Sequence, residues 1–115
     1  MSSSITTHVL DTTLGIPARG VHITVERQER STEWKEIARA VTNSEGRVSD
    51  LLPENVKLIA GVYRLTFDSR GYFGSRNVET FYPSITIVFE LQDPAAHYHV
   101  PLLLSPFGYS TYRGS

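Results

Sequence analysis

The sequence predicts an all-β sandwich, and three observations support that fold class. Apolar and polar residues alternate with a period of two in several short runs, as at Val21, Ile23 and Val25. Those runs are rich in β-branched and aromatic residues, which favour strands over helices. Turn-forming residues separate them, for example at residues 43–46 and 52–55. Several short strands with regular turns are typical of a sandwich and not of parallel β-α-β units.

The chain divides into eight expected strands. Alternation is clearest in the second, fifth and sixth strands, where Ile23, Leu65 and Ile87 lie at the centres of the apolar rows. Turns at residues 15–17 and 93–94 separate further strands. The strands cover approximately residues 5–10, 20–29, 33–42, 46–50, 61–68, 84–92, 97–105 and 108–113.

Residues 68–75 break the two-residue period. Asp68 and Ser69 are both suitable N-caps, so one or two helical turns are expected here. Gly71 and Gly74 disfavour a longer helix, because glycine loses the most backbone freedom on helix formation.

Composition narrows the possible functions. The chain has 115 residues, with no repeat, low-complexity tract or linker, so residues 1–115 are expected to form one domain. Lysine and arginine number 11 and aspartate and glutamate 12, which gives a net charge of −1. That balance provides no electrostatic basis for binding nucleic acid or an anionic membrane.

The residues that are missing from the sequence are also informative. There is no cysteine, which excludes disulfides, thiol nucleophiles and cysteine-based zinc sites. No apolar run approaches the ~20 residues that a membrane span requires. No secretory signal is evident after Met1. A cytoplasmic location is expected, or a peroxisomal one if a targeting extension is missing.

The sequence His97-Tyr98-His99 places two histidines on one face of a strand, because side chains alternate. Tyr98, Val100 and the alternate leucines after them would then face the core. The histidine face could line a pocket or an interface, or the histidines could be incidental surface residues, which periodicity alone favours. A His-x-His pair can chelate a metal, but Asp93 is the only nearby carboxylate, so a metal site is not expected.

Other candidate residues are ambiguous when each is considered alone. His8 suits a half-buried structural position, and His22 shares a face with Thr24 and Glu26, which indicates solvent. Arg47 follows a turn and suits a solvated position there. The end of the chain is more unusual, because Phe107, Tyr109 and Tyr112 are aromatic, and a C-terminus is ordinarily polar and frayed. These three aromatic residues are expected to hold the last strand against another surface.

Three blocks of the chain resemble the transthyretin-related 5-hydroxyisourate hydrolases, a family of enzymes of urate degradation. The most specific block is the C-terminal Tyr112-Arg113-Gly114-Ser115. Residues 97–109, and residues 7–12 together with 15–18, are similar to two further blocks of that family. The resemblance covers nearly the whole chain.

The resemblance implies a fold and an assembly. The fold is a transthyretin-like eight-stranded β-sandwich with one short helix after the fifth strand. The assembly is a homotetramer, a dimer of dimers, with active sites in the channel at the dimer–dimer interface.

The resemblance also implies a site and a reaction. It places the catalytic residues at His8, Arg47 and His99, and gives His97 at most a supporting role. The substrate-binding tetrapeptide that closes the site is Tyr112, Arg113, Gly114 and Ser115. The reaction is hydrolysis of 5-hydroxyisourate, a small purine-derived substrate, to 2-oxo-4-hydroxy-4-carboxy-5-ureidoimidazoline, with no cofactor. Either His8 or His99 would act as the base, and the sequence leaves that choice open.

Two other functional classes remain from the sequence. Transthyretins share this fold and carry small hydrophobic ligands in the same channel, but they lack the terminal tetrapeptide and the histidine at the position of His99. Accessory β-sandwich modules of larger proteins also resemble parts of the chain, such as residues 61–65. Those shared segments indicate the fold and carry no chemistry.

Overall fold

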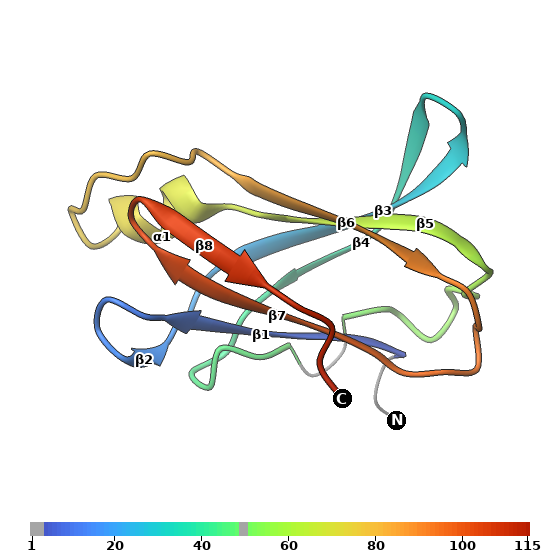
Figure 1. The fold of residues 1–115 in the computed structure, drawn as a ribbon, viewed down its shortest axis with the longest axis horizontal. Helices are drawn as coiled ribbons and strands as arrows, with labels where there is room; N and C mark the ends of the chain where they lie inside the picture. Colours follow the sequence, from blue (N-terminus) through green and yellow to red (C-terminus); the bar gives the residue numbers. More distant parts are fainter. Residues whose placement is uncertain (1–3, 49–50) are drawn as a thin grey trace.

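The structure is a computed structural model that describes residues 4–48 and 51–115. Two four-stranded sheets face each other, with strand orders β2-β1-β7-β8 and β4-β3-β5-β6 (Figure 1). The first sheet contains β1 (Ile5–Asp11), β2 (Ile16–Pro17), β7 (Tyr98–Ser105) and β8 (Gly108–Thr111). The second contains β3 (His22–Arg30), β4 (Glu33–Val41), β5 (Gly61–Phe67) and β6 (Ile85–Leu91). The predicted all-β sandwich is confirmed.

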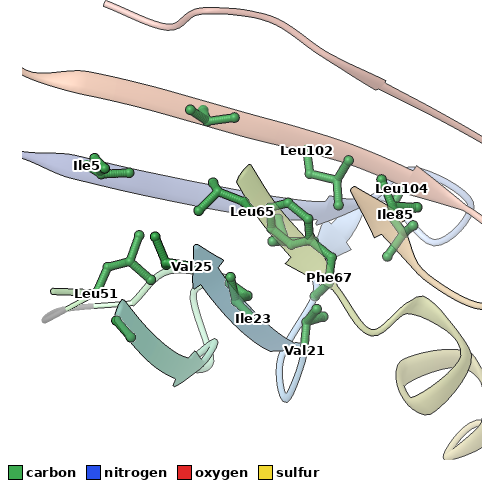
Figure 2. Close-up of a cluster of buried hydrophobic side chains, with 14 of the residues drawn as sticks. Ile5, Val21, Ile23, Val25, Leu51, Leu65, Phe67, Ile85, Leu102 and Leu104 are labelled. Atoms are coloured by element: carbon green, nitrogen blue, oxygen red, sulfur yellow. The ribbon is translucent and has the colours of Figure 1, made fainter. Parts of the chain in front are cut away.

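The core lies between the two sheets and is built from the apolar rows that the sequence indicated. Figure 2 shows Ile5 and Leu102 of one sheet facing Leu65 and Phe67 of the other. These side chains are at most 1% exposed, so their burial removes apolar surface from water and holds the sheets together. Each strand therefore has a second face that points away from the core, and the histidines of β1 and β7 lie on such a face.

The pairing of β1 with β7 positions the candidate site. The two strands are parallel, and their register places Thr6 opposite His99 and His8 opposite Pro101. They come from opposite ends of the chain and lie at the centre of their sheet. Residues about 90 positions apart, such as Thr6 and His99, are therefore direct neighbours.

The helix forms where the sequence predicted it. It is α1 (Ser69–Gly74), directly after β5, and the Asp68 carboxylate accepts a hydrogen bond from the Gly71 amide at 2.9 Å. Tyr72 on the helix donates its hydroxyl to the buried Asp11 carboxylate at 2.8 Å, which ties the helix to the end of β1. Across the described residues, no helix has the length and apolar character that a membrane crossing needs.

The fourth predicted strand, at residues 46–50, is wrong in its described part, and residues 49–50 lie outside the described residues. Residues 46–48 form only an isolated antiparallel bridge, between Arg47 and His8. Gly46 has φ +74°, a left-handed conformation that turns the chain and prevents a longer ladder. The eighth strand is instead β2, at Ile16–Pro17, where a turn was expected. Proline is tolerated there because β2 is an edge strand.

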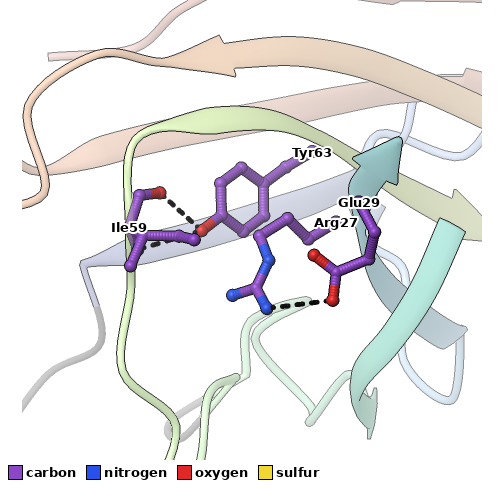
Figure 3. Close-up of polar contacts among 4 residues, drawn as sticks. All are labelled: Arg27, Glu29, Ile59 and Tyr63. Carbon is purple, nitrogen blue, oxygen red and sulfur yellow. Dashed lines mark hydrogen bonds and ion pairs between the residues drawn. The ribbon is translucent and has the colours of Figure 1, made fainter. Parts of the chain in front are cut away.

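A tyrosine anchors the loop that precedes β5 (Figure 3). The hydroxyl of Tyr63 donates to the Ile59 carbonyl at 2.7 Å and accepts from the Ile59 amide at 3.2 Å. Nearby, Arg27 and Glu29 form an ion pair at 3.4 Å. These contacts lie in the second sheet, away from the histidines of the first.

Candidate active site

Three polar side chains form a bridge on the outer face of the first sheet. The hydroxyl of Thr6 lies 2.9 Å from Nε2 of His97 and 2.8 Å from Nδ1 of His99. The two imidazole rings stack at 6.5 Å between centroids, with an angle of 22° between their planes. The alternation predicted for this strand is confirmed, because Tyr98 and Val100 are buried and His99 is only half-buried.

A surface pocket of about 430 Å³ opens beside this bridge. Its walls come from β1, from the segment after the residue 43–46 turn, from β7 and from the C-terminus. Its lining residues are Thr6, Thr7, Arg47, Val48, His97, His99 and Ser115. Arg47 makes no ion pair with any carboxylate among the described residues, so its charge is available to an anionic ligand.

His99 has the properties of a neutral base. Burial lowers its pKa from the usual 6.5, and the positive charge of Arg47 and the neighbouring histidines lower it further, while the bond to Thr6 opposes the shift. The ring is therefore mostly uncharged at neutral pH. Nδ1 is bonded to Thr6, and Nε2 has no hydrogen-bond partner within residues 4–48 and 51–115. A neutral imidazole with one free nitrogen can accept a proton.

His8 lies on the same face of β1 as Thr6, two residues away. Its Nε2 is 2.9 Å from the Glu45 carbonyl, which can only accept, so this nitrogen carries the proton of the bond. His8 does not line the 430 Å³ pocket itself. It is joined to the site through its backbone bridge with Arg47 and through its electrostatic effect on His99.

The C-terminal tetrapeptide runs alongside β7 and contacts the site through backbone and side chain. The Gly114 amide donates to the His99 carbonyl at 2.8 Å. A β-carbon at position 114 would lie 2.5 Å from Cδ2 of the His99 ring. Glycine is therefore required at this position because the histidine ring approaches the backbone this closely.

The two residues before Gly114 line a second pocket, which is smaller than the 430 Å³ pocket. The guanidinium of Arg113 stacks 4.6 Å above the Tyr98 ring. Tyr112 and Arg113 line an apolar pocket of about 250 Å³ with His99, which therefore borders both pockets. Tyr112 and Arg113 are thus placed next to the catalytic candidate on its other side, and Ser115 lies in the larger pocket.

The aromatic residues near the C-terminus are largely exposed in the single chain, so the surface against which they hold the last strand stays a prediction. Phe107 is 70% exposed, Tyr109 is 43% exposed and Tyr112 is 59% exposed. Only Tyr109 makes a ring contact among the described residues, edge-on with Tyr82 at 5.3 Å. The tail is held instead by the hydrogen bonds of β8 and by the bridge between Gly114 and His99.

The structure therefore brings together Arg47, His99 and Ser115 in one pocket, with His8 beside it. His22 is exposed on the other sheet, as predicted. Thr6 was not identified from the sequence. Its position two residues before His8 was visible, but its contact with His97 and His99 depends on the β1–β7 pairing. No group of three or more potential metal ligands was found in the part of the chain that the structure describes.

Comparisons with known proteins are consistent with this geometry. The HIUase/Transthyretin family model matches residues 5–114. The chain is 48% identical over 121 residues to the 5-hydroxyisourate hydrolase of Halalkalibacterium halodurans, covering all of both chains.

Solved structures share the fold closely. A Klebsiella pneumoniae 5-hydroxyisourate hydrolase is 35% identical, with a TM-score of 0.82 over 96% of this chain and 98% of that chain. Sea bream transthyretin in complex with thyroxine is 33% identical, with a TM-score of 0.89 over 96% of this chain and 94% of that chain. Since both backbones superpose well, the fold does not distinguish an enzyme from a carrier, and the side chains of the site must do so.

Proposed function

The chain belongs to the HIUase/Transthyretin family, and we propose that it is an enzyme that hydrolyses 5-hydroxyisourate. The observation that supports this most directly is the pocket in which His99, Arg47 and Ser115 meet, in a chain similar over its whole length to a 5-hydroxyisourate hydrolase. A carrier of hydrophobic ligands has no need of a half-buried histidine beside an arginine that pairs with no carboxylate in residues 4–48 and 51–115.

The proposed reaction adds water to a ring carbonyl of the substrate. A base removes a proton from the water as its oxygen bonds to the carbonyl carbon. The carbon–nitrogen bond then breaks, and the leaving ring nitrogen receives a proton. General acid–base catalysis contributes about 10²–10⁴-fold, so stabilisation of the developing charge must provide much of the remaining acceleration.

We assign the base to His99 and not to His8. His99 lines the pocket, its lowered pKa keeps it neutral, and its Nε2 is free to accept a proton. His8 is held by its bond to the Glu45 carbonyl at 2.9 Å, and it adjoins the site through its backbone bridge with Arg47. From there it adds to the electrostatic field of the site and is available for the later proton transfer to the leaving nitrogen.

Arg47 binds the developing oxyanion, because its planar fork of donors has no carboxylate partner among the described residues and faces the pocket. Ser115 lines the same pocket and contributes its hydroxyl. Gly114 keeps the tail against His99, and Tyr112 with Arg113 closes the other side of the ring. No cofactor takes part in this scheme.

The protein is also proposed to form a homotetramer, built as a dimer of dimers. Both β6 and β8 are edge strands, and unpaired edges favour association with another chain. Large apolar side chains near these edges are exposed, including Val88 at 57% and Phe107 at 70%. Light scattering at micromolar concentration should give a mass four times that of the chain, and a monomer would contradict the proposal.

The proposed activity is tested by a direct assay. The ultraviolet absorbance of freshly prepared 5-hydroxyisourate decays spontaneously, and the purified protein should accelerate that decay at catalytic concentrations. Heat-denatured protein is the control. A decay no faster than that of the control would contradict the proposed function while leaving the family assignment intact.

A further inference from the structure

Thr6 has one hydroxyl proton to share between two histidines. Its oxygen is within hydrogen-bond distance of Nε2 of His97, at 2.9 Å, and of Nδ1 of His99, at 2.8 Å. A hydroxyl can donate one hydrogen bond and accept two, so it either donates to one of these nitrogens and accepts from the other, or accepts from both when both carry a proton. The hydroxyl therefore couples the two rings, because its single proton cannot satisfy an unprotonated nitrogen on both of them.

The two arrangements in which the hydroxyl donates to a ring nitrogen differ in what they leave facing the pocket. If Thr6 donates to Nδ1 of His99, the neutral ring carries its proton on Nε2 and has no free lone pair. If Nδ1 of His99 donates to Thr6, the hydroxyl donates onward to Nε2 of His97, and Nε2 of His99 keeps its lone pair. The second arrangement allows His99 to accept a proton in the pocket, and it also uses the hydroxyl proton, which bonds to neither ring when both nitrogens donate to Thr6.

We propose that Thr6 is a positioning residue that fixes the tautomer of His99, with Nδ1 protonated and Nε2 free, and that His97 is the terminal acceptor of this chain of hydrogen bonds. The inference rests on the proposed function, since it specifies how the base of that reaction is prepared. His97 suits the terminal position because it is exposed and its ring is stacked on that of His99.

The arrangement also suits the proton transfer itself. When Nε2 of His99 takes a proton from water, the ring becomes an imidazolium. Its Nδ1–H still donates to Thr6, now as a stronger, charge-assisted bond. In the opposite arrangement Nε2 of His99 already carries a proton, so the hydroxyl would have to rotate and His99 would have to change its tautomer before Nε2 could take a proton from water. A bond that needs no rearrangement during the reaction is what an orienting partner provides.

Several other charged groups surround His99, and the test must separate their effects from that of Thr6. His8 lies on β1, Arg47 on the segment after the residue 43–46 turn, and His97 just before β7. Glu90 of β6 and Arg113 line the smaller pocket with His99, and the C-terminal residue Ser115 lines the larger one. None of these groups is removed by a change at Thr6, so a change in the pH profile of a Thr6 variant reports on the hydroxyl.

The test compares three variants of the full-length protein. Thr6→Val removes the hydroxyl with little change in shape, and Thr6→Ser retains it. Thr12→Val is the matched control, because the Thr12 hydroxyl also bonds a β7 residue, the Leu104 carbonyl at 3.1 Å, at the far end of the strand pair from His99. The melting temperatures of the three variants show how much stability the protein loses when a hydroxyl between β1 and β7 is removed.

Nitrogen-15 NMR of the imidazole rings gives the first readout, which does not depend on catalysis. In the unmodified protein His99 should show a protonated Nδ1 and an unprotonated Nε2 at about pH 7.5, and His97 should show an unprotonated Nε2. In Thr6→Val the His99 signals should shift toward a mixture of both tautomers. Finding Nε2 of His99 protonated in the unmodified protein would overturn the inference, whether or not the protein hydrolyses 5-hydroxyisourate.

Kinetics gives the second readout. Thr6→Val should lower kcat about tenfold, part of the ~10²–10⁴-fold that a general base provides, with little change in KM. Its pH–rate profile should also shift on the acid side. Thr6→Ser should restore kcat and the profile, and Thr12→Val should leave both unchanged. Equal losses in Thr6→Val and Thr12→Val, or an unchanged profile in Thr6→Val, would reduce Thr6 to a structural role.

Discussion

The outer faces of the two sheets carry pockets of similar size and similar residue types. The pocket on the first sheet has a volume of about 430 Å³ and includes His99, Arg47 and Thr6. The pocket on the second sheet has a volume of about 380 Å³ and includes His22, Arg39 and Thr66. Size and residue type therefore do not identify which pocket is the site.

The two pockets differ in how their charges are compensated. Arg39 is paired with Glu36 at 2.8 Å, and the Asp68 carboxylate in the same pocket caps α1. Arg47, by contrast, has no carboxylate partner among the described residues. It helps to lower the pKa of the half-buried His99. A fold retains an uncompensated charge next to a desolvated base only at some cost in stability, which is why such pairs mark functional sites.

The largest expected effect comes from replacing His99 of the first pocket, and His22 of the second pocket is its control. His99→Ala should lower kcat by about a hundredfold or more, because it removes the proposed base. The fold should persist, since the side chain lies on the outer face of β7. Ultraviolet assay and circular dichroism of the purified variant provide the measurement. His22→Ala, its counterpart on the second sheet, should leave turnover close to that of the unmodified protein. Equal effects at the two positions would remove the distinction between the pockets.

The next effect concerns the contact between the tail and the His99 ring. Gly114→Ala should lower kcat by about ten- to a hundredfold, because its β-carbon would overlap Cδ2 of His99 and displace the ring. Gly108→Ala is the matched control in the same terminal segment, since its β-carbon would meet the Ser105 hydroxyl at an ordinary 3.7 Å. Steady-state kinetics and melting temperatures should separate the two. A fully active Gly114→Ala protein would show that the tail does not position His99.

A smaller effect is expected from the arginines. Arg47→Lys keeps the charge but loses the planar fork of donors, so kcat/KM should fall about tenfold while the melting temperature changes little. Arg39→Lys, in the paired and exposed position, should change neither quantity. If Arg47→Lys retains full activity, a point charge is sufficient there and bidentate binding is wrong. If it unfolds the protein, Arg47 is a structural residue.

The smallest effect is on pH dependence. Because the pKa of His99 is lowered, the base stays neutral below the usual histidine range, and the acid side of the kcat/KM profile should fall with an apparent pKa below 6.5. The same lowered pKa also determines how the free energy of unfolding changes with pH. Unfolded His99 binds a proton more readily than folded His99, so its contribution to stability is complete above pH 6.5 and is lost as the pH falls below that value.

Urea unfolding at about pH 7.5 and about pH 5.5 measures this contribution. The loss of stability on acidification should be smaller in His99→Gln than in the unmodified protein. An equal loss of stability in both proteins would mean that His99 is solvated like an ordinary surface histidine. A kcat/KM profile whose acid side falls with an apparent pKa above 6.5 would mean the same.

The sequence determined those features that depend on local pattern. The two-residue period and the turn signals predicted every strand of the two sheets except β2, and the core faces of β3, β5 and β7. Asp68 and the glycines after it predicted a short capped helix. The faces of His99 and His22 also followed from alternation. The predicted strand at 46–50 is wrong in its described part, because Gly46 has a left-handed conformation that belongs to the turn at residues 43–46, and Arg47 forms only a single bridge with His8.

The tertiary structure alone decided which of these residues meet. The parallel pairing of β1 with β7 is a contact between the two ends of the chain, and nothing local in either segment specifies its register. That register places the Thr6 hydroxyl between two histidines and the His99 ring against Gly114. Desolvation and the positive charge of Arg47, which lower the pKa of His99, depend on distances between segments that only the packed sandwich sets. The sequence, through its resemblance to a family, therefore indicated the proposed site residues, and the packing of the sheets determines the surroundings of each of them.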